Sequence, residues 1–373
     1  MPTPFLIRRL LLTTDAVGGV WTYTLDLARA CSQLDIAVDL VVIGPEPSPE
    51  KTTEAASIRN VRLTHLDLPL DWMAEDVEAV RKVGERLSAL ATKSGCDLAH
   101  LHSPALAADA SFPVPLVASL HSCVGTWWRE VRRGEDMPED FAWRTALMRR
   151  ALRRADAVIV PSASFADTAG KVYGGNIPFR VVHNGTSFPG AGPEMDRSVV
   201  LSAGRFWDES KNLAALDLAA SHLGFSVYVA GPLEGPNGAC VCPRHVRRLG
   251  ELSRSAMQAW LARTSIFVST ALYEPFGLSV LEAAQSGCAL VLSDIPTFHE
   301  LWDGAALFVD PRRSRSVADS VTELAADEEL TERLAASARR RARQYSMEAV
   351  VGRTLAIYRE VAARSVPTLR GAA

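Results

Sequence analysis

The sequence predicts an α/β protein with two doubly wound parallel sheets. Short aliphatic and β-branched runs alternate with helical segments, the alternation restarts in the second half of the chain, and a stretch rich in glycine and proline separates the halves. Continuous apolar runs are typical of parallel strands, because helices cover both faces of such sheets. A chain of 373 residues is long enough for two domains with separate cores.

The first half begins with an expected strand at 5–12, a glycine turn that contains Gly18 and Gly19, and a helix at 21–31. Later apolar runs have the length of strands: 36–43, 98–101, 116–120, 157–160 and 180–182. Two windows have apolar residues at helical spacing: 76–93 and 142–155. Strands that alternate with helices in this way indicate a Rossmann-like domain.

The second half repeats this order after the stretch at 184–193, whose glycines and prolines predict a linker. Its expected strands are 199–203, 227–230, 266–269 and 289–292. Its expected helices are 212–220, 256–262, 278–285 and 315–326, and the segment 327–362 is nearly all helical in pattern. We therefore expect domains at 1–188 and 189–346, followed by a C-terminal segment at 347–373.

The composition excludes several classes of protein. Forty basic side chains against 43 acidic ones give a net charge of -3, so no nucleic-acid partner is expected. Six cysteines are too few for a disulfide-stapled fold. The N-terminal apolar run is too short for a signal sequence, and no apolar stretch approaches the roughly 18 residues of a membrane span. We expect a cytoplasmic protein.

The strongest candidate site lies between Glu274 and Glu282, directly after an expected strand. Gly277 opens the next helix, so the backbone N–H groups of Gly277, Leu278 and Ser279 can bind an anion such as a diphosphate. Glu282 can accept hydrogen bonds from a ribose diol, and Glu274 can hold sugar hydroxyls. The alternative is that Glu274 caps the helix and Glu282 is a solvated surface residue.

Arg205 and Lys211 form a second candidate group after the strand at 199–203. Two fixed cations there would stabilise the charge of a departing nucleoside diphosphate. A surface ion pair to Asp208 or Glu209 explains them equally well. The chain has no Asp-x-Asp sequence, so we expect no metal ion in this role.

Histidines form a third group. His121 directly follows the strand at 116–120, where a catalytic or a structural role is equally consistent with the pattern. His100 and His102 share one face of a strand, but they lack neighbouring Cys or Asp ligands, which disfavours a metal site. Cys240, Cys242 and His245 could hold a metal ion, but their spacing is wrong for the usual zinc sites, so we expect a loop.

In combination, these motifs resemble the retaining GT-B glycosyltransferases of family GT4. The resemblance covers almost the whole chain and is most specific from 201 to 311. It implies that Glu274 contacts the donor sugar, Glu282 the ribose, Arg205 and Lys211 the diphosphate, and His121 the sugar near the reacting carbon. The donor-site residues that it implies are Gly18, Gly19, Arg205, Lys211, Glu274, Phe276, Gly277, Leu278, Ser279 and Glu282.

The resemblance further implies two domains that face a cleft, a C-terminal helix that crosses back to the first domain, and metal-independent transfer of a hexose from a UDP-, GDP- or ADP-sugar. The acceptor hydroxyl, on a saccharide, a lipid-linked molecule or a small molecule, stays unidentified. The segment 295–300 departs from the Gly-Gly-x-x-Glu element of many members, which leaves the sugar open. An epimerase of the same fold and a non-catalytic nucleotide-sugar-binding protein are the alternatives.

The acceptor side has a basic amphipathic helix, with five arginines between 144 and 154, near Trp127 and Trp128. Such a helix can lie on an anionic membrane, at the inner face in a cytoplasmic protein. A solvated helix that packs its apolar stripe on the sheet explains the same pattern, and we favour this interpretation.

Overall fold

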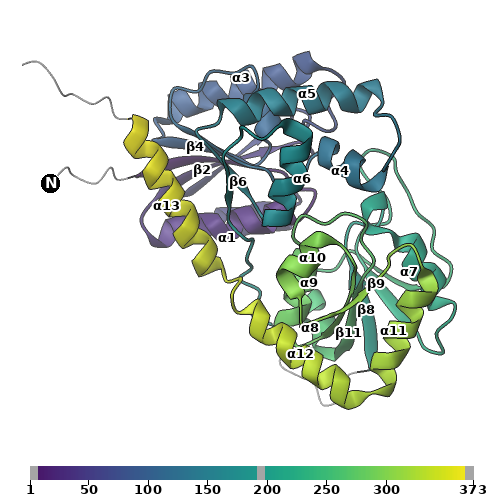
Figure 1. Ribbon diagram of the computed structural model, residues 1–373. Coiled ribbons are helices and arrows are strands. Elements are labelled where there is room, and N and C mark those ends of the chain that lie inside the picture. The colour runs from purple at the N-terminus through teal and green to yellow at the C-terminus, as the bar shows by residue number, and fades with distance from the viewer. Residues whose placement is uncertain (1–6, 191–197, 366–373) are drawn as a thin grey trace, which may run out of the picture. The chain divides into compact units, whose positions relative to one another are not determined.

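The computed structural model describes residues 7–190 and 198–365, and the chain forms two compact units. Unit 1 contains the described residues up to 129, residues 134–183 and the described residues from 347 onward. Unit 2 contains residues 130–133 and 184–346. Each unit is a parallel sheet with helices on both faces (Figure 1).

The sheet of unit 1 has seven parallel strands in the order β3-β2-β1-β4-β5-β6-β7. Their bounds are β1 Arg9–Thr14, β2 Ala37–Ile43, β3 Val61–Leu66, β4 Leu98–Leu101, β5 Leu116–Ser119, β6 Ala157–Val160 and β7 Phe179–Val181. Every residue of β4, β5 and β6 is buried, as expected for central strands. The strand expected at 5–12 begins at Arg9 among the described residues, while Phe5 and Leu6 lie outside them.

The helices before residue 183 are α1 Gly19–Gln33, α2 Pro49–Ala56, α3 Val77–Ser94, the 3₁₀ turn η1 Pro104–Ala107, α4 Val124–Val131, α5 Glu139–Arg154 and α6 Ala163–Tyr173. Helix α13, Met347–Ser365, also belongs to unit 1. In Figure 1, α1 and α13 lie on one face of the sheet, and α3 and α5 lie on the other.

Helix α13 completes the core of unit 1. Val350, Leu355 and Tyr358 are buried in the same hydrophobic cluster as Leu10 and Leu12 of β1. Burying a large apolar side chain contributes about 1.5–3 kcal/mol, so this helix is an integral part of the domain and not an appendage.

The sheet of unit 2 has six parallel strands in the order β10-β9-β8-β11-β12-β13. Their bounds are β8 Val199–Ala203, β9 Val227–Ala230, β10 Arg247–Gly250, β11 Thr264–Ser269, β12 Ala289–Ser293 and β13 Leu307–Val309. Successive strand residues enter opposite cores: Val200 packs with Leu216 of one cluster, and Leu201 packs with Leu281 of the other.

The helices of unit 2 are the 3₁₀ turn η2 Glu209–Lys211, α7 Leu213–Ala220, α8 Arg254–Arg263, α9 Leu278–Gln285, α10 Pro296–Trp302, α11 Ser314–Ala326 and α12 Glu328–Ala342. The predicted linker at 184–193 needs a correction over its described part. Phe188 is 5% exposed and packs in the core of unit 2, and Thr186 pairs with Ser346. Residues 191–193 of this stretch lie outside the described residues.

Within residues 7–190 and 198–365, every helix is too short or too polar to span a bilayer.

Candidate active site

The predicted site residues lie where each sheet reverses its strand order, between β1 and β4 in unit 1 and between β8 and β11 in unit 2. Ligands of doubly wound sheets bind beyond the carboxyl ends of the strands at such a point. Arg205 and Lys211 follow β8, Glu274 follows β11, and the Gly18–Gly19 turn follows β1. His121 follows β5, which is the neighbour of β4.

The loop after β8 is tied to the loop after β11 by hydrogen bonds. Leu272 N–H donates to Ser210 O at 2.8 Å, and Asn212 Nδ2 donates to Thr270 O at 3.0 Å. Asn212 has φ +51°, the left-handed region that Asn tolerates better than most residues. These bonds fix the direction of Lys211, which lies between Ser210 and Asn212.

Lys211 and Glu274 form an ion pair in unit 2, with Nζ and Oε2 2.6 Å apart. Their side chains are 19% and 14% exposed, so water screens the pair only in part. Helix α9 has no side-chain cap, because its N-cap is Gly277. The alternative in which Glu274 caps this helix is therefore wrong, and so is a surface ion pair from Lys211 to Asp208 or Glu209.

The start of α9 offers backbone donors beside this pair. Gly277 has φ +91°, and an added Cβ would lie 3.2 Å from Phe298 Cε1, so glycine suits this position for two reasons. The N–H groups of Leu278 and Ser279 have no acceptor within the helix, as in the first turn of any α-helix. Glu282 is half-buried in the second turn. This arrangement can bind an anion.

Two predicted residues have different surroundings. The side chain of Phe276 is 2% exposed and packs edge-on against Tyr345, so it supports the core, and only its main chain can face a ligand. Arg205 does not join the ion pair. Its guanidinium instead forms an ion pair with Asp208 at 3.9 Å, so the alternative of a surface ion pair holds for Arg205. The guanidinium also lies 5.5 Å from the centre of the Trp207 ring, and the side chain is 38% exposed.

In unit 1, His121 lies against His102 and Tyr23. His121 Nε2 and His102 Nδ1 are 2.6 Å apart, and the Tyr23 ring centre is 4.9 Å from that of His121. Burial lowers the pKa of His121 to about 4, so its imidazole is neutral at pH 7. Tyr23 belongs to α1, the helix that begins at Gly19 and has Gly18 as its N-cap. The structure thus brings His121 and the glycine turn to one edge of the sheet.

Sequence reasoning missed three residues of this edge. His102 and Tyr23 contact His121, and the signal for His102 was its place after a strand adjacent to β5. The third is Asp71, which lies before α3. Burial, and secondarily the nearby Asp15, raise the pKa of Asp71 to about 6.

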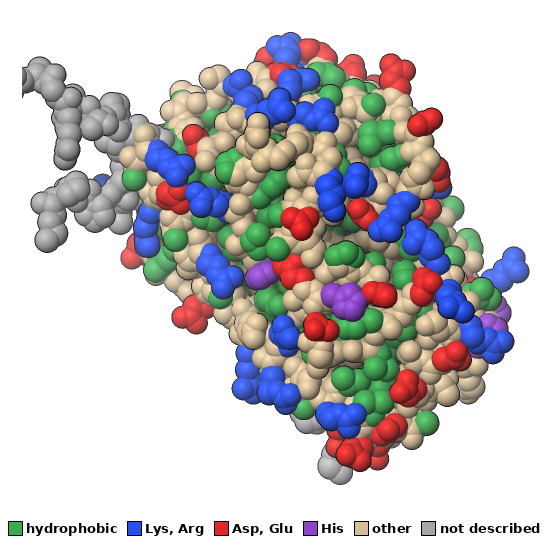
Figure 2. All heavy atoms as spheres, viewed as in Figure 1, with side chains coloured by type: hydrophobic (Ala, Val, Ile, Leu, Met, Phe, Trp, Pro, Cys, Tyr) green, Lys and Arg blue, Asp and Glu red, His purple; other side chains and the backbone are tan. Residues whose placement is uncertain are grey.

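The basic helix α5 uses most of its arginines within the protein. Their acceptors are Ala74 O for Arg144, Val172 O for Arg149, Asp109 for Arg150 and Ala110 O for Arg154. Figure 2 shows Asp and Glu side chains among the Lys and Arg side chains over α3 and α5. These contacts agree with the interpretation of α5 as a solvated helix packed on its own domain.

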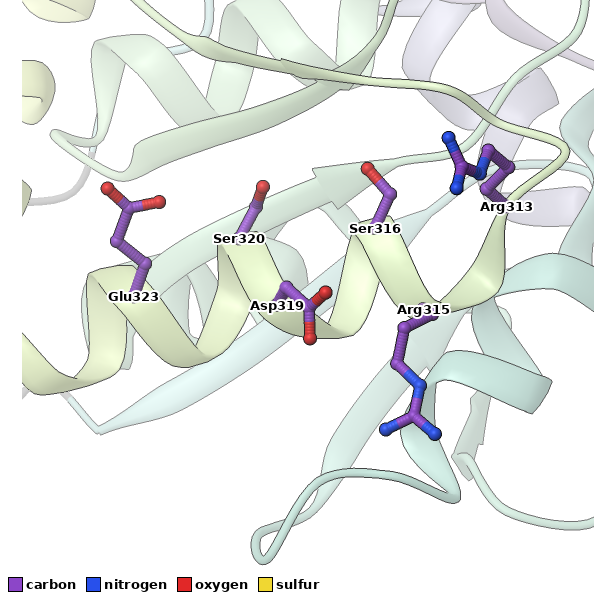
Figure 3. Close-up of a pocket in the computed structure, with 6 residues that line it drawn as sticks. All are labelled: Arg313, Arg315, Ser316, Asp319, Ser320 and Glu323. Carbon is purple, nitrogen blue, oxygen red and sulfur yellow. The ribbon is translucent and has the colours of Figure 1, made fainter.

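Figure 3 shows a hollow along α11 that contains none of the predicted site residues. Its lining is polar and mostly exposed: Arg313, Arg315, Ser316, Asp319, Ser320 and Glu323. Over the described residues, no three His, Cys, Asp or Glu side chains are grouped to hold a metal ion. Cys240 and Cys242 are exposed free thiols in the loop between β9 and β10.

Comparison with known proteins agrees with this architecture. Residues 17–187 match the sequence model of Glycosyltransferase Family 4, and residues 187–341 match that of Glycosyl transferases group 1. A glycogen synthase of Mycobacterium tuberculosis is 27% identical over 300 residues, which cover 72% of this chain and 70% of that protein.

Solved structures share the fold over nearly the full length. A sucrose-phosphate synthase from Thermosynechococcus elongatus has a TM-score of 0.80 at 19% identity, with 96% of this chain and 100% of that chain covered. Anabaena HepE in complex with UDP-glucose has a TM-score of 0.73 at 19% identity, with 94% and 99% covered. The chain is therefore an enzyme of the GT-B glycosyltransferase fold, and it belongs to the GT4-type glycosyltransferases.

Proposed function

We propose that this glycosyltransferase moves a hexose from a nucleotide-diphosphate sugar to a hydroxyl acceptor, with retention of anomeric configuration and without an obligatory metal ion. The observation that carries the proposal is the Lys211–Glu274 ion pair at the reversal point of unit 2, beside the start of α9. This group offers a cation and backbone N–H donors to a diphosphate, and carboxylates to the hydroxyls of sugar and ribose.

In this proposal Lys211 and Arg205 bind the diphosphate, and Lys211 moves from Glu274 toward the phosphate when the donor arrives. Glu274 then accepts hydrogen bonds from sugar hydroxyls, and Glu282 accepts them from the ribose. Neutral His121 and the Gly18–Gly19 turn act on the donor sugar and the acceptor side. The solved HepE complex with UDP-glucose, a protein of the same fold, supports a nucleotide sugar as the donor.

The reaction breaks the bond between the anomeric carbon and the diphosphate oxygen, and it forms a bond from the acceptor oxygen to the same face of that carbon. The acceptor proton passes to the leaving phosphate oxygen, so no covalent enzyme intermediate is required. Lys211 and Arg205 stabilise the negative charge that develops on the diphosphate, and charge-stabilising groups of this kind contribute about 2.7–4 kcal/mol to catalysis.

Thermal shifts with UDP, GDP and ADP test the donor site. A ligand at 100 times its Kd stabilises the folded state by about 2.7 kcal/mol, so one nucleotide should raise Tm well above the other two and so identify the base. Glu282→Ala should reduce this shift, while the control Glu323→Ala, on the hollow of α11, should leave it unchanged.

Product analysis separates the alternatives. A glycosyltransferase releases nucleoside diphosphate together with a glycosylated acceptor, and NMR of the product shows whether the anomeric configuration is retained. A converted nucleotide sugar without acceptor would indicate an epimerase, and binding without any product would indicate a sensor. Either result, or an inverted product, would refute the proposed reaction.

We propose a cytoplasmic location, as expected from the sequence, and an acceptor that carries a hydroxyl group. We give no weight to an anionic membrane surface, because the arginines of α5 are largely hydrogen-bonded within unit 1.

A further inference from the structure

His102 is a buried histidine whose side chain makes one hydrogen bond among the described residues, to His121. The two residues follow the adjacent strands β4 and β5, and His102 N–H donates to Thr13 Oγ1 of β1 at 2.9 Å, which fixes the backbone. His102 is 6% exposed. Its Nδ1 lies 2.6 Å from His121 Nε2, and its Nε2 is buried without a partner among the described residues.

The hydrogen bond between these imidazoles couples their protons. A neutral imidazole has one N–H and one bare nitrogen, and burial keeps both rings neutral at pH 7 by lowering the pKa of each. If His102 donates from Nδ1, then His121 has its proton on Nδ1. If His121 donates from Nε2, then its Nδ1 is bare. Each arrangement gives His121 Nδ1 a single role, as a donor or as an acceptor.

His121 Nδ1 is the nitrogen left for a ligand. This nitrogen has no hydrogen-bond partner among the described residues. Unlike His102 Nε2, it is not buried from solvent, so a ligand can reach it. The ring cannot rotate freely, because the Tyr23 ring packs against both histidines at centre distances of 5.4 and 4.9 Å. Tyr23 itself is 2% exposed, so the packing around it holds its ring in place against the two histidines.

We propose that His102 is a positioning residue for the transfer reaction: it holds His121 in one tautomer and one ring orientation, so that His121 Nδ1 meets the donor sugar with a fixed hydrogen-bonding role. The inference rests on the proposed function for its consequence in catalysis, but the tautomer itself does not depend on it. His102 contacts the reacting groups only through His121.

The test compares two substitutions at position 102 by NMR of the imidazole nitrogens of His121 in the full-length protein. His102→Phe keeps a ring and removes the hydrogen bond. His102→Asn keeps a polar atom near the position of Nδ1, so that a hydrogen bond to His121 Nε2 is retained. Tyr358→Phe is the matched control, because it removes the 2.5 Å hydrogen bond to His100 Nδ1 in the same buried cluster without touching His121.

We expect a single His121 tautomer in the native protein, in His102→Asn and in Tyr358→Phe, and a mixture of tautomers in His102→Phe. In the transferase assay, His102→Phe should lower kcat by about 10- to 100-fold, the range known for removal of the partner that orients a metal-bound histidine. His102→Asn should recover most of this loss. A Tm close to that of the native protein in each variant would show that the fold is intact.

An unchanged His121 tautomer in His102→Phe would overturn the inference and leave the proposed transferase activity untouched. A mixture of tautomers with native kcat would overturn the positioning role. If His121 has a single tautomer in the native protein but the protein transfers no sugar from any nucleotide donor, the proposed function fails. The inference that His102 fixes the tautomer of His121 is then unaffected.

Discussion

Substitution of Lys211 alone, and of Lys211 together with Glu274, should affect stability and catalysis differently. For unit charges 2.6 Å apart, Coulomb attraction at an effective dielectric constant of about 20 is about 6 kcal/mol, most of which desolvation offsets. Removal of one partner costs 0–1 kcal/mol for exposed pairs and 3–5 for buried pairs. With side chains 19% and 14% exposed, we expect Lys211→Met to cost about 1–3 kcal/mol.

The second substitution, Glu274→Gln, should restore stability but not function. In Lys211→Met the carboxylate of Glu274 is left half-buried without its cation, and in the double variant that charge is gone. Calorimetry should therefore show Tm lowered by about 2–4 °C per kcal/mol in Lys211→Met, with partial recovery in the double variant. Turnover should fall 10²- to 10³-fold in Lys211→Met and stay low in the double variant.

Arg150→Met combined with Asp109→Asn is the matched control, because it removes a 2.9 Å ion pair between Arg150 of α5 and Asp109 and should leave turnover unchanged. Two outcomes would refute the reasoning. One is additivity of the two site substitutions in stability within about 0.5 kcal/mol, which would show that the residues do not interact. The other is native turnover in the double variant, which would place the diphosphate elsewhere.

Two further predictions concern backbone and pH. Gly231→Ala should destabilise unit 2 by about 3 kcal/mol or more, because the added Cβ would lie 2.0 Å from Gly204 O at φ +133°; Gly224→Ala, where no atom lies within 4 Å, is the control, and equal Tm values for the two would contradict this packing. Burial lowers the pKa of three histidines: His100 to about 3, His121 to about 4, and His102 well below its usual value. As the pH falls from 6.5 to 5, these three histidines become protonated in the unfolded chain but stay neutral in the folded protein. The free energy of unfolding should therefore fall by up to about 1.4 kcal/mol per histidine per pH unit. Asp71, with a raised pKa of about 6, stabilises the folded protein as the pH falls, but it is one group against three histidines. A Tm that rises as the pH falls over this range would contradict the predicted net loss of stability.

The central strands could be predicted from sequence because they are buried on both faces. β4, β5 and β6 are fully buried and appear as continuous apolar runs. The strands β3, β10 and β13, at the edges of their sheets, were missed: β3 and β13 are only partly buried, and β10 is largely exposed and contains Arg247 and Arg248. A short or partly exposed strand has no long apolar run to distinguish it from a loop.

The candidate site was predictable in location and less so in contacts. Position after a strand marked Lys211, Glu274 and His121, because parallel strands deliver their carboxyl ends to one edge. The contact between Lys211 and Glu274, 63 residues apart in sequence, depends on β8 and β11 being neighbours, which no local pattern specifies. The bond between His102 and His121 depends in the same way on the pairing of β4 with β5.

The dependence of unit 1 on α13 has a consequence for synthesis on the ribosome. Residues 184–346 of unit 2 emerge before Met347–Ser365, so the later domain has its complete sequence first. Until the last helix is translated, the apolar side chains of the earlier domain that pack in one cluster with Val350, Leu355 and Tyr358 lack this cover and are open to aggregation or to chaperones. The nascent chain thus finishes its first domain last.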